Sequence, residues 1–299
     1  MNKHSARKGY IYIFIAGVFW GTIGTGLKLL TDRGLSEIQA SFFLQAGAFI
    51  VILPYVIFTC GLKSLRIKPR LFLILFLTGL FSEALFDYCY ASAIERMGVA
   101  ISAVVMYLAP VFVLIASRLL FGETVTRNKK IAVVVNLAGC FLTVTGGSLK
   151  GSSFSVAGLL FGIVTAICYG VITISDKYTA GQAPPPVIAF YILLCGFVTM
   201  SLLNRCWTFD SSILTPANFG LGIGAGIFAA FLPKLFFAGG LACDIEASKA
   251  PVIASVEVIV AAILGVVLFR EKLGVFNILG IAIVILSIVI MNRKETPET

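Results

Sequence analysis

Among the ionisable residues inside the long apolar stretches of this sequence, where a charged side chain is costly, four are worth weighing. They are Glu83, Asp87, Lys234 and Glu257. An ionisable group in the hydrocarbon core of a membrane is unfavourable unless it faces protein or water, and such groups mark binding sites, ion pathways and proton relays. Each of the four is therefore a candidate for binding a solute or carrying a proton.

Glu257 is the most central of the four. It lies near the middle of an apolar block at 247–268, and at 1.5 Å per residue its depth is within about 2 Å of the midplane. A carboxylate there could bind a cationic group, or hold a proton, because desolvation favours the neutral acid. The alternative is a structural hydrogen bond to a neighbouring helix.

Glu83 and Asp87 are four residues apart in the block 71–92, so they share one helix face. Glu83 lies roughly 3 Å from the midplane and Asp87 one turn further outward. Two close carboxylates disfavour double ionisation, and one of them can stay protonated near neutral pH. That suits proton coupling or cation binding. The alternative places Asp87 at the outer interface, paired with Arg96.

Lys234 follows Pro233 in the block 217–239. A proline frees a backbone carbonyl and often bends a transmembrane helix. The alternative is that Lys234 extends toward the inner interface, as long cationic side chains do. From the rise per residue, Lys234 lies too far inward to pair directly with Glu83.

Aromatic residues form a second layer of candidates. Trp20, Tyr107 and Tyr169 could line a cavity, stack on a substrate, or hold a cation against the ring face. Tyr88 and Tyr90 could do the same, but the belt of aromatic residues at a membrane interface is the favoured explanation for these two.

These residues must be positioned by membrane-spanning helices. Apolar residues make up 59% of the 299 positions, charged residues 12%, and the mean hydropathy is +1.02. Apolar blocks of about 20 residues, each enough to cross a bilayer, recur without period-2 alternation, which favours helices over a barrel. We expect an all-α polytopic membrane protein with about ten transmembrane helices, at 10–30, 38–59, 71–92, 98–117, 130–147, 155–175, 186–204, 217–239, 247–268 and 274–291.

The net charge of +9 comes mostly from cations between these blocks. With the N-terminus inside, the inside loops of the first half carry 11 Lys and Arg residues and the outside loops carry 3. Such a bias orients membrane proteins, and it predicts that both termini are cytoplasmic. We expect no nucleic-acid partner, since no basic domain is present to bind one. Seven scattered cysteines without a CxxC pair argue against a metal or redox site, and we expect no cofactor.

The chain resembles itself at a shift of half its length. Trp20-Gly21 and Lys28 recur as Tyr169-Gly170 and Lys177, a shift of 149, and the run 121–123 recurs at 269–271, a shift of 148. With five spans in each half, the two copies must have opposite orientations. The sequence predicts two units, 1–148 and 149–299, as inverted repeats, which are typical of transporters with a midplane site between the repeats. The alternative is an old duplication kept for packing.

These segments resemble the EamA-type transporters of the drug/metabolite transporter superfamily. The resemblance rests on FWGTIGTGLKLL at 19–30, on the stretch 89–123 and, more weakly, on 239–273. Ala109-Pro110 and Gly122-Glu123 match the family pattern. The usual Glu-Pro of the ninth helix is Glu257-Val258 here, which questions a kink at that point. Many members carry an arginine in the second helix; the nearest polar residue here is Gln45, a difference that bears on the substrate class.

The resemblance implies a carrier that moves small metabolites by alternating access. We expect a secondary transporter for an amino acid, related metabolite or drug, with export as the direction, in the bacterial inner membrane. Its partners are then the solute, the lipid bilayer and, as a candidate coupling ion, a proton. The sequence sets no oligomeric state. The alternatives are a passive facilitator or channel and, less favoured, a membrane-embedded enzyme, because no catalytic motif or metal-ligand cluster is present. No nucleotide-binding loop is present either, so a gradient must supply the energy.

Overall fold

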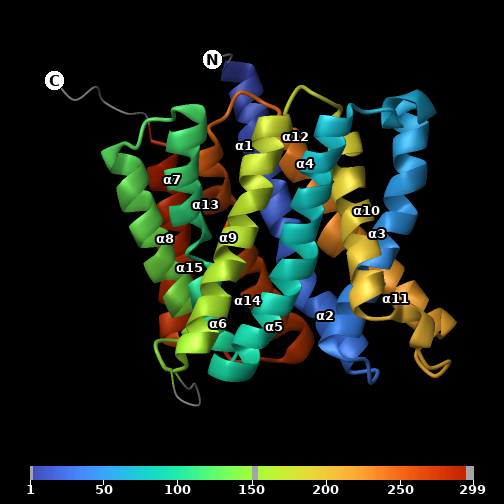
Figure 1. Ribbon diagram of the computed structural model, residues 1–299. Coiled ribbons are helices and arrows are strands. Elements are labelled where there is room, and N and C mark those ends of the chain that lie inside the picture. The colour runs from blue at the N-terminus through green and yellow to red at the C-terminus, as the bar shows by residue number, and fades with distance from the viewer. Residues whose placement is uncertain (1–2, 150–153, 294–299) are drawn as a thin grey trace.

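The chain forms a bundle of helices that run between two opposite faces (Figure 1). The computed structural model describes residues 3–149 and 154–293. Within these ranges the secondary structure is helical apart from one isolated β-bridge, Ala180 to Ala183. Both chain ends lie on the same face, which we call the terminal face; the other is the opposite face (Figure 1). Lys150, one of the cations counted in the loops, lies outside the described residues.

The helices of the first half are α1 (Lys3–Trp20), α2 (Ile23–Thr31), α3 (Glu37–Cys60), η1 (Leu62–Leu65), α4 (Pro69–Gly79), η2 (Leu80–Leu85), α5 (Phe86–Met97), α6 (Val99–Met106), α7 (Ala109–Phe121) and α8 (Arg127–Thr145). Those of the second half are α9 (Val156–Thr179), α10 (Pro185–Leu203), η3 (Cys206–Thr208), α11 (Pro216–Gly226), η4 (Ile227–Phe231), α12 (Leu232–Leu241), η5 (Ala247–Lys249), α13 (Ala250–Ala254), α14 (Val256–Phe269) and α15 (Val275–Met291).

Eight helical segments of the described chain are long and apolar enough to cross a membrane. The apolar helix α15 is shorter, and α8 begins with the cationic run Arg127–Lys130. The two pack closely along their lengths, with Gly139 against Val284 and Gly280 against Thr143. The expectation of an all-α polytopic membrane protein is therefore confirmed, whereas the count of ten spans stays a prediction.

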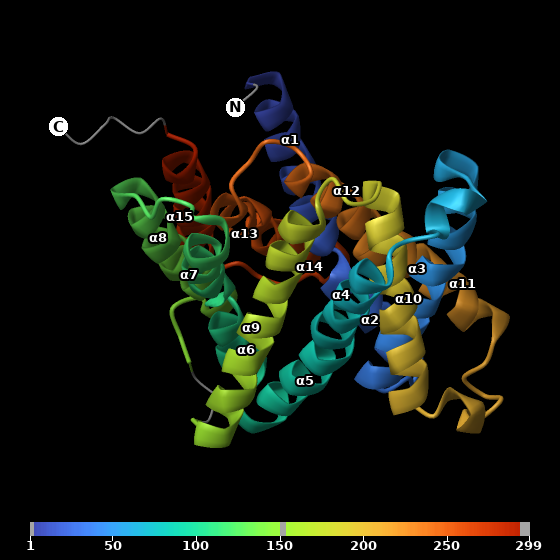
Figure 2. The same ribbon diagram turned by 45° about the horizontal axis from the view of Figure 1, so that its top comes forward.

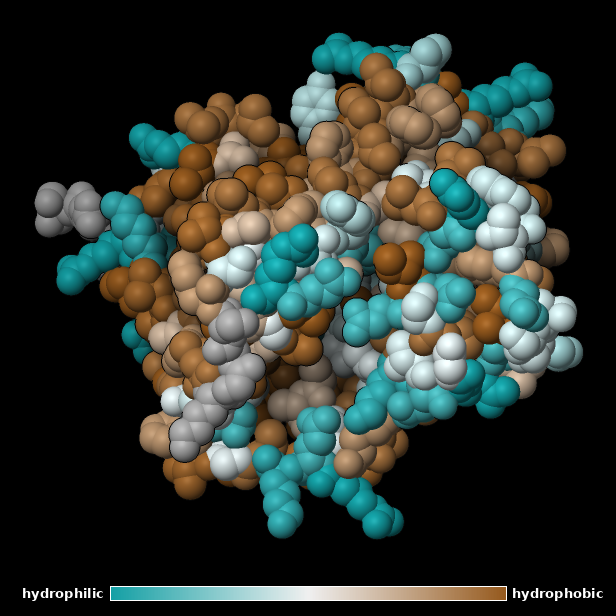
Figure 3. Space-filling model, turned by 60° about the horizontal axis from the view of Figure 1, so that its bottom comes forward, coloured by the Kyte–Doolittle hydropathy of each residue, from teal (hydrophilic) through white to brown (hydrophobic). Residues whose placement is uncertain are grey.

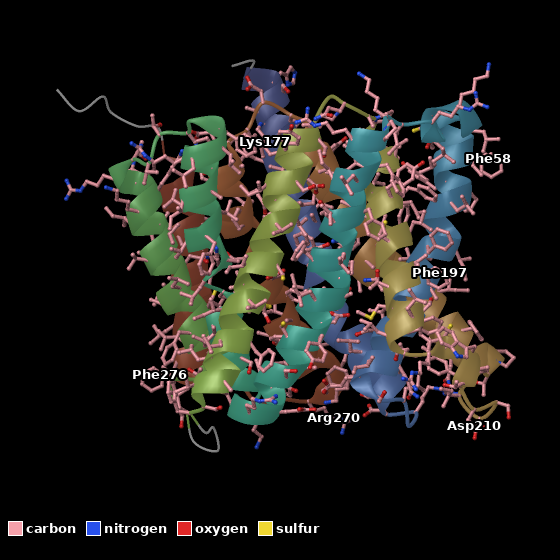
Figure 4. The ribbon with its side chains drawn as sticks, in the orientation of Figure 1. Phe58, Lys177, Phe197, Asp210, Arg270 and Phe276 are labelled. Atoms are coloured by element: carbon pink, nitrogen blue, oxygen red, sulfur yellow. The ribbon has the colours of Figure 1, made fainter. Side chains whose placement is uncertain are left out.

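Large apolar side chains cover the outside of the bundle. Phe58, for example, is 86% exposed on α3, and Phe276 projects outward at the start of α15 (Figure 4). In a soluble protein such a surface would be an aggregation hazard, but here it is the surface that a bilayer covers. In two views α7, α8 and α15 lie at one end of the bundle and α3, α10 and α11 at the other (Figures 1 and 2).

Local sequence sets the helix ends. Ser36 accepts a hydrogen bond from the backbone N–H of Gln39, whose side chain accepts one from the Ser36 N–H, a capping box that starts α3. Gly122 ends α7 with φ of 68°, a left-handed conformation that glycine adopts without strain.

Pairs of glycines four residues apart (GxxxG) bring helices close together. A methyl group at Gly17 would lie 2.6 Å from Val256 Cγ1, and one at Gly226 would lie 2.6 Å from the Ala48 backbone nitrogen. At Gly47 it would overlap the carbonyl oxygen of Gly222. Small residues permit such backbone contacts between transmembrane helices.

Five helices that the sequence predicts as continuous are interrupted. The first breaks between Trp20 and Ile23, the fourth between Met106 and Ala109, and the ninth at Ser255. The third and eighth each contain a π-helical turn, η2 and η4. Although Val258 stands where the family usually has proline, the ninth helix is interrupted at Ser255, where α13 ends and α14 begins.

Candidate functional site

Helix interruptions bring together four mid-span candidates, which we call the first group: Trp20, Tyr107, Tyr169 and Glu257. Trp20 is the last residue of α1, Tyr107 follows the end of α6, and Glu257 lies in the first turn of α14. Tyr169 projects from the uninterrupted α9. The first turn of a helix presents unpaired N–H groups and favours an anion, so the break at Ser255 suits the Glu257 carboxylate.

Tyrosine hydroxyls hold the Glu257 carboxylate. The Tyr169 hydroxyl lies 3.1 Å from each carboxylate oxygen, and Tyr107 makes a second side-chain hydrogen bond. Glu257 is buried. Its expected alternative, a structural hydrogen bond to a neighbouring helix, is therefore present, and it does not exclude a functional role because two hydroxyls leave further acceptor capacity on the carboxylate.

Aromatic rings surround this carboxylate. Trp20 and Tyr169, related by the shift of 149, meet edge to face with ring centroids 5.9 Å apart. Trp20 also packs on Phe237 at 4.8 Å, and Phe86 contacts Tyr169 at 6.4 Å. A carboxylate beside aromatic rings is an arrangement suited to an organic cation.

The second group is centred on an ion pair between Glu83 and Lys234. Glu83 lies in the π-helical turn η2, and Lys234 lies just beyond η4. Lys234 Nζ is 2.5 Å from Glu83 Oε1, and both residues are buried. Gln45 Nε2 donates to Glu83 Oε2, so three helices meet at one carboxylate.

The expectation that Lys234 is too far inward to reach Glu83 is wrong, as is the alternative that it extends to the interface. The expectation assumes straight helices with a rise of 1.5 Å per residue, whereas both helices contain a π-helical turn. The four methylene groups of a lysine side chain also carry its ammonium group far from its Cα.

Asp87 belongs to the second group and not to the interface. Its side chain hydrogen-bonds Ser41, and the charges of Glu83 and Lys234 act on it. Arg96, the expected alternative partner, contacts Glu95 at 3.8 Å and donates to the Ser92 carbonyl.

Asp176 is a buried carboxylate that sequence reasoning missed. It is 1% exposed on α9, and neither oxygen has a hydrogen-bond partner among the described residues. The expected block ends at 175, one residue before Asp176. The available signal was its spacing of seven from Tyr169, which places both on one helix face.

The first and second groups are adjacent. Phe86 contacts Tyr169 of the first group and directly precedes Asp87 of the second group in the chain. The opposite face is hollowed near its centre (Figure 3). A separate cavity of about 390 Å³ between α2, α11 and α14 has an apolar lining that includes Leu29, Gly224 and Phe228 and contains none of the ionisable candidates. The polar chemistry therefore lies elsewhere, in the bundle interior.

A polar network closes the terminal face, where Lys177 lies at the end of α9 (Figure 4). Glu123 Oε1 accepts from the Ala247 N–H at 2.5 Å, and Oε2 accepts from the Ser248 N–H at 3.1 Å and hydroxyl at 2.5 Å. Lys129 Nζ is 2.7 Å from Glu246. This terminal-face network joins the loop after α7 to the loop before α13.

The network also fixes the charge of Glu246. Burial raises the pKa of this carboxyl, but hydrogen bonds and charge from Lys129 and Lys249 outweigh burial and leave the pKa below its ordinary value of 4.5. Glu246 is therefore ionised at neutral pH. Among the described residues, no group of three or more histidines, cysteines or carboxylates is arranged to hold a metal.

Comparison with known proteins identifies relatives along the whole chain. The chain is 27% identical to "Uncharacterized transporter YwfM" of Bacillus subtilis (strain 168), over 97% of this chain and 98% of the relative. It is 23% identical to "Uncharacterized inner membrane transporter YicL" of Salmonella typhimurium, over 96% of each. A solved structure titled "Crystal structure of protein" shares the fold, with a TM-score of 0.77, 18% identity and coverage of 95% and 97%.

The profile of the EamA-like transporter family matches twice, over residues 7–145 and 156–293. The resemblance drawn from 19–30 and 89–123 is thereby confirmed. Because the two matches together cover nearly all of a polytopic helical bundle, and full-length relatives are named as transporters, this chain is a membrane transporter and belongs to the EamA-like transporter family.

Proposed function

We propose that the protein is a secondary transporter that moves a small organic solute with a protonated amine, such as an amino acid, related metabolite or drug, by alternating access. The observation that carries the proposal is the Glu257 carboxylate held by Tyr169 and Tyr107 beside Trp20, where three helices are interrupted. Interrupted helices near the midplane are where transporters bind solutes.

The chemistry of this group supports a cationic moiety. Glu257 supplies the anion, the rings supply negatively polarised faces, and a solute ammonium between them would interact with both. The Tyr169 and Tyr107 hydroxyls each donate a hydrogen bond to the carboxylate, which orients it. An anionic solute would instead meet repulsion from a buried carboxylate, which is a way to exclude it.

Inverted repeats provide the means of alternating access. The breaks near Tyr107 and at Ser255 are related by a shift of 148, and the π-helical turns that begin at Leu80 and Ile227 by a shift of 147. The family profile matches each half once. These correspondences support two copies that rock against each other around a site at their interface.

We assign the terminal face to the cytoplasm. The excess of Lys and Arg in the loops on this side supports the assignment, and the inner-membrane name of one relative supports the plasma membrane. The hollow of Figure 3 then opens to the outside, and the terminal-face network seals the inside. Export is the direction that the family resemblance implies.

A thermal-shift screen of purified protein over amines, amino acids and drugs, with neutral and anionic analogues beside them, tests the proposal. Hits are then followed into proteoliposomes. Amines should stabilise the parent and the variant Glu95→Gln, in which the altered side chain is 77% exposed, but not Glu257→Gln. Binding of only neutral or anionic solutes, retained in Glu257→Gln, would overturn the site.

The proteoliposomes also separate the main alternative. A coupled carrier accumulates the solute above its external concentration when an ion gradient is imposed, whereas a passive facilitator only equilibrates it. Unchanged solute with appearance of a new product would instead indicate an enzyme.

A further inference from the structure

Lys234 has more carboxylates around it than it can neutralise. Glu83 holds its ammonium group at 2.5 Å. Asp176 is also within electrostatic reach of Lys234, and so is Asp87. Three carboxylates and one ammonium would carry two net negative charges in the interior, where unpaired charge is strongly unfavourable. Two protons, or other cations, must balance the group.

Asp176 is the carboxyl that most requires such a proton. It is buried and has no hydrogen-bond donor among the described residues, whereas Asp87 hydrogen-bonds Ser41 and Glu83 has Lys234 and Gln45. A buried carboxylate without donors pays its full desolvation cost, and in practice such a group becomes neutral instead.

The neighbours of Asp176 offer no other compensation. Beside it, Ser175 accepts a hydrogen bond from Thr78 at 2.6 Å. Lys177 points its ammonium group to the Ile245 carbonyl at 2.6 Å. Among the described residues, the charged groups of the neighbouring helices are Lys234 on α12, whose charge acts on Asp176, and Glu83 and Asp87 on η2 and α5, which interact with Lys234. Lys249 on η5 pairs with Glu246 at 2.8 Å.

We propose that Asp176, Lys234 and Glu83 form a proton-coupling site in which two carboxyls compete for one ammonium group. In the state described here Lys234 pairs with Glu83, and Asp176 and Asp87 each carry one of the two balancing protons. The inference rests on the proposed transport function and adds its coupling ion. It assigns Asp176 and Lys234 a role separate from solute binding at Glu257.

The exchange conserves charge and protons. When the terminal face opens, Asp176 releases its proton to water on that side, and the O–H bond electrons stay on the carboxylate. Lys234 then moves its ammonium group from Glu83 to Asp176. Glu83, which keeps its hydrogen bond from Gln45, takes up a proton from the side of the central hollow. One proton enters at Glu83, one leaves from Asp176, and the net charge of the group is unchanged.

The positions of the three residues suit this path. In span 69–97 Glu83 lies at the midpoint. Lys234 lies seven residues and Asp176 three residues before the terminal-face ends of their spans, 216–241 and 156–179. The lysine thus lies between its two carboxyl partners in depth.

Infrared difference spectroscopy of the reconstituted protein tests the site without a solute. A protonated carboxyl group absorbs at higher frequency than a carboxylate, so titration with pH reports the buried acid. The parent should absorb in the protonated-carboxyl region at neutral pH, and Asp176→Asn should lose one component of this absorption, the Asp176 band. Asp210→Asn, the same substitution in an exposed loop (Figure 4), should keep it.

Glu83→Gln provides a second test that leaves Asp176 in place. Without Glu83, Lys234 is free to pair with Asp176, so the Asp176 band should be lost through ionisation. Persistence of the full band in either Asp176→Asn or Glu83→Gln would overturn the proposal. So would displacement of the band by sodium, but not by choline, at constant pH, since sodium would then be the ion.

A transport assay completes the test once the screen above yields a solute. Asp176→Asn should retain solute exchange at Glu257 but lose accumulation driven by a pH gradient. If Asp176 had only a structural role, exchange and accumulation would be lost together. Equal proton-driven accumulation in parent and variant would refute coupling here. Absence of any transport in the parent would instead count against the proposed function, and the infrared result would stand.

Discussion

Replacing Glu123 by glutamine should loosen the terminal face of the bundle. The carboxylate accepts three hydrogen bonds, from Ala247 and twice from Ser248, and its side chain is 9% exposed, so water screens it little. Glutamine keeps one acceptor oxygen. If that oxygen retains the Ser248 contacts, the amide NH2 faces the Ala247 N–H, and a donor then meets a donor.

The magnitude follows from these bonds. A hydrogen bond to a charged group contributes about 1.5–3 kcal/mol and a neutral one about 0.5–1.5 kcal/mol. At the lower ends of these ranges, losing the bond to Ala247 costs about 1.5 kcal/mol and weakening the two bonds to Ser248 about 1 kcal/mol each, so the total is about 3.5 kcal/mol. At 1.4 kcal/mol per tenfold, the equilibrium between closed and open terminal faces shifts on the order of 100-fold toward open.

Hydrogen exchange measures this shift directly. The Ala247 and Ser248 amides, which donate to Glu123, should exchange on the order of 100-fold faster in Glu123→Gln when opening is a fast pre-equilibrium to exchange. Glu271→Gln is the matched control, because Glu271 is the repeat-related residue and is exposed on the opposite face; it should leave these two amides unchanged. Parental exchange rates at both amides in a folded Glu123→Gln protein would refute the assignment of this network as the closure.

Three further outcomes follow from single contacts. Gly47→Ala should lower the melting temperature, because its methyl group would overlap the Gly222 carbonyl. The methyl group of Gly224→Ala meets open space, so this variant should be more stable by about 0.5–1 kcal/mol and melt at a slightly higher temperature. Equal shifts in melting temperature would contradict the packing described. The pKa of Glu246 is lowered, so the contribution of its carboxylate to stability is complete above pH 4.5 and is lost as pH falls through the pKa of the folded state. Below pH 4.5 the melting temperature of Glu246→Gln should therefore fall less steeply with pH than that of the parent. Asn136→Leu, which removes bonds of 2.6 and 3.0 Å to Ser255 and Ser287, should cost only about 1 kcal/mol, because both serine hydroxyls also donate to carbonyls in their own chain segments; calorimetry that finds a loss of several times this size would contradict it.

The sequence predicted the helices because bilayer physics imposes a simple pattern. Each expected block coincides with a helical segment within a few residues, and Glu83 and Glu257 stand out because carboxyl groups are rare in such blocks. Hydropathy averaged over a span does not reveal where a helix is interrupted, however, since the span is apolar on both sides of the break. Tyr107 and Ser255 interrupt their helices within uniformly apolar stretches.

The pairing of side chains was harder to predict. An estimate of membrane depth along straight helices places Lys234 too far from Glu83 to form an ion pair, because it omits the π-helical turns and the length of the lysine side chain. Asp176 was missed because α9 continues to Thr179, four residues beyond the expected end. Both errors arise at helix distortions and helix ends, which depend on tertiary contacts that no local pattern contains.

The pairing of Glu83 with Lys234 also affects how the protein is made. Lys234 follows Glu83 by 151 residues, and at about 5–20 residues per second a ribosome needs about 8–30 s to synthesise that interval. During this time the helix with Glu83 has entered the membrane without its cation. Gln45, which is synthesised before Glu83 and donates to it, can satisfy the carboxyl group throughout this period. Loss of the Gln45 amide would then first appear as poor membrane insertion and rapid degradation of the nascent chain, before any effect on the finished transporter.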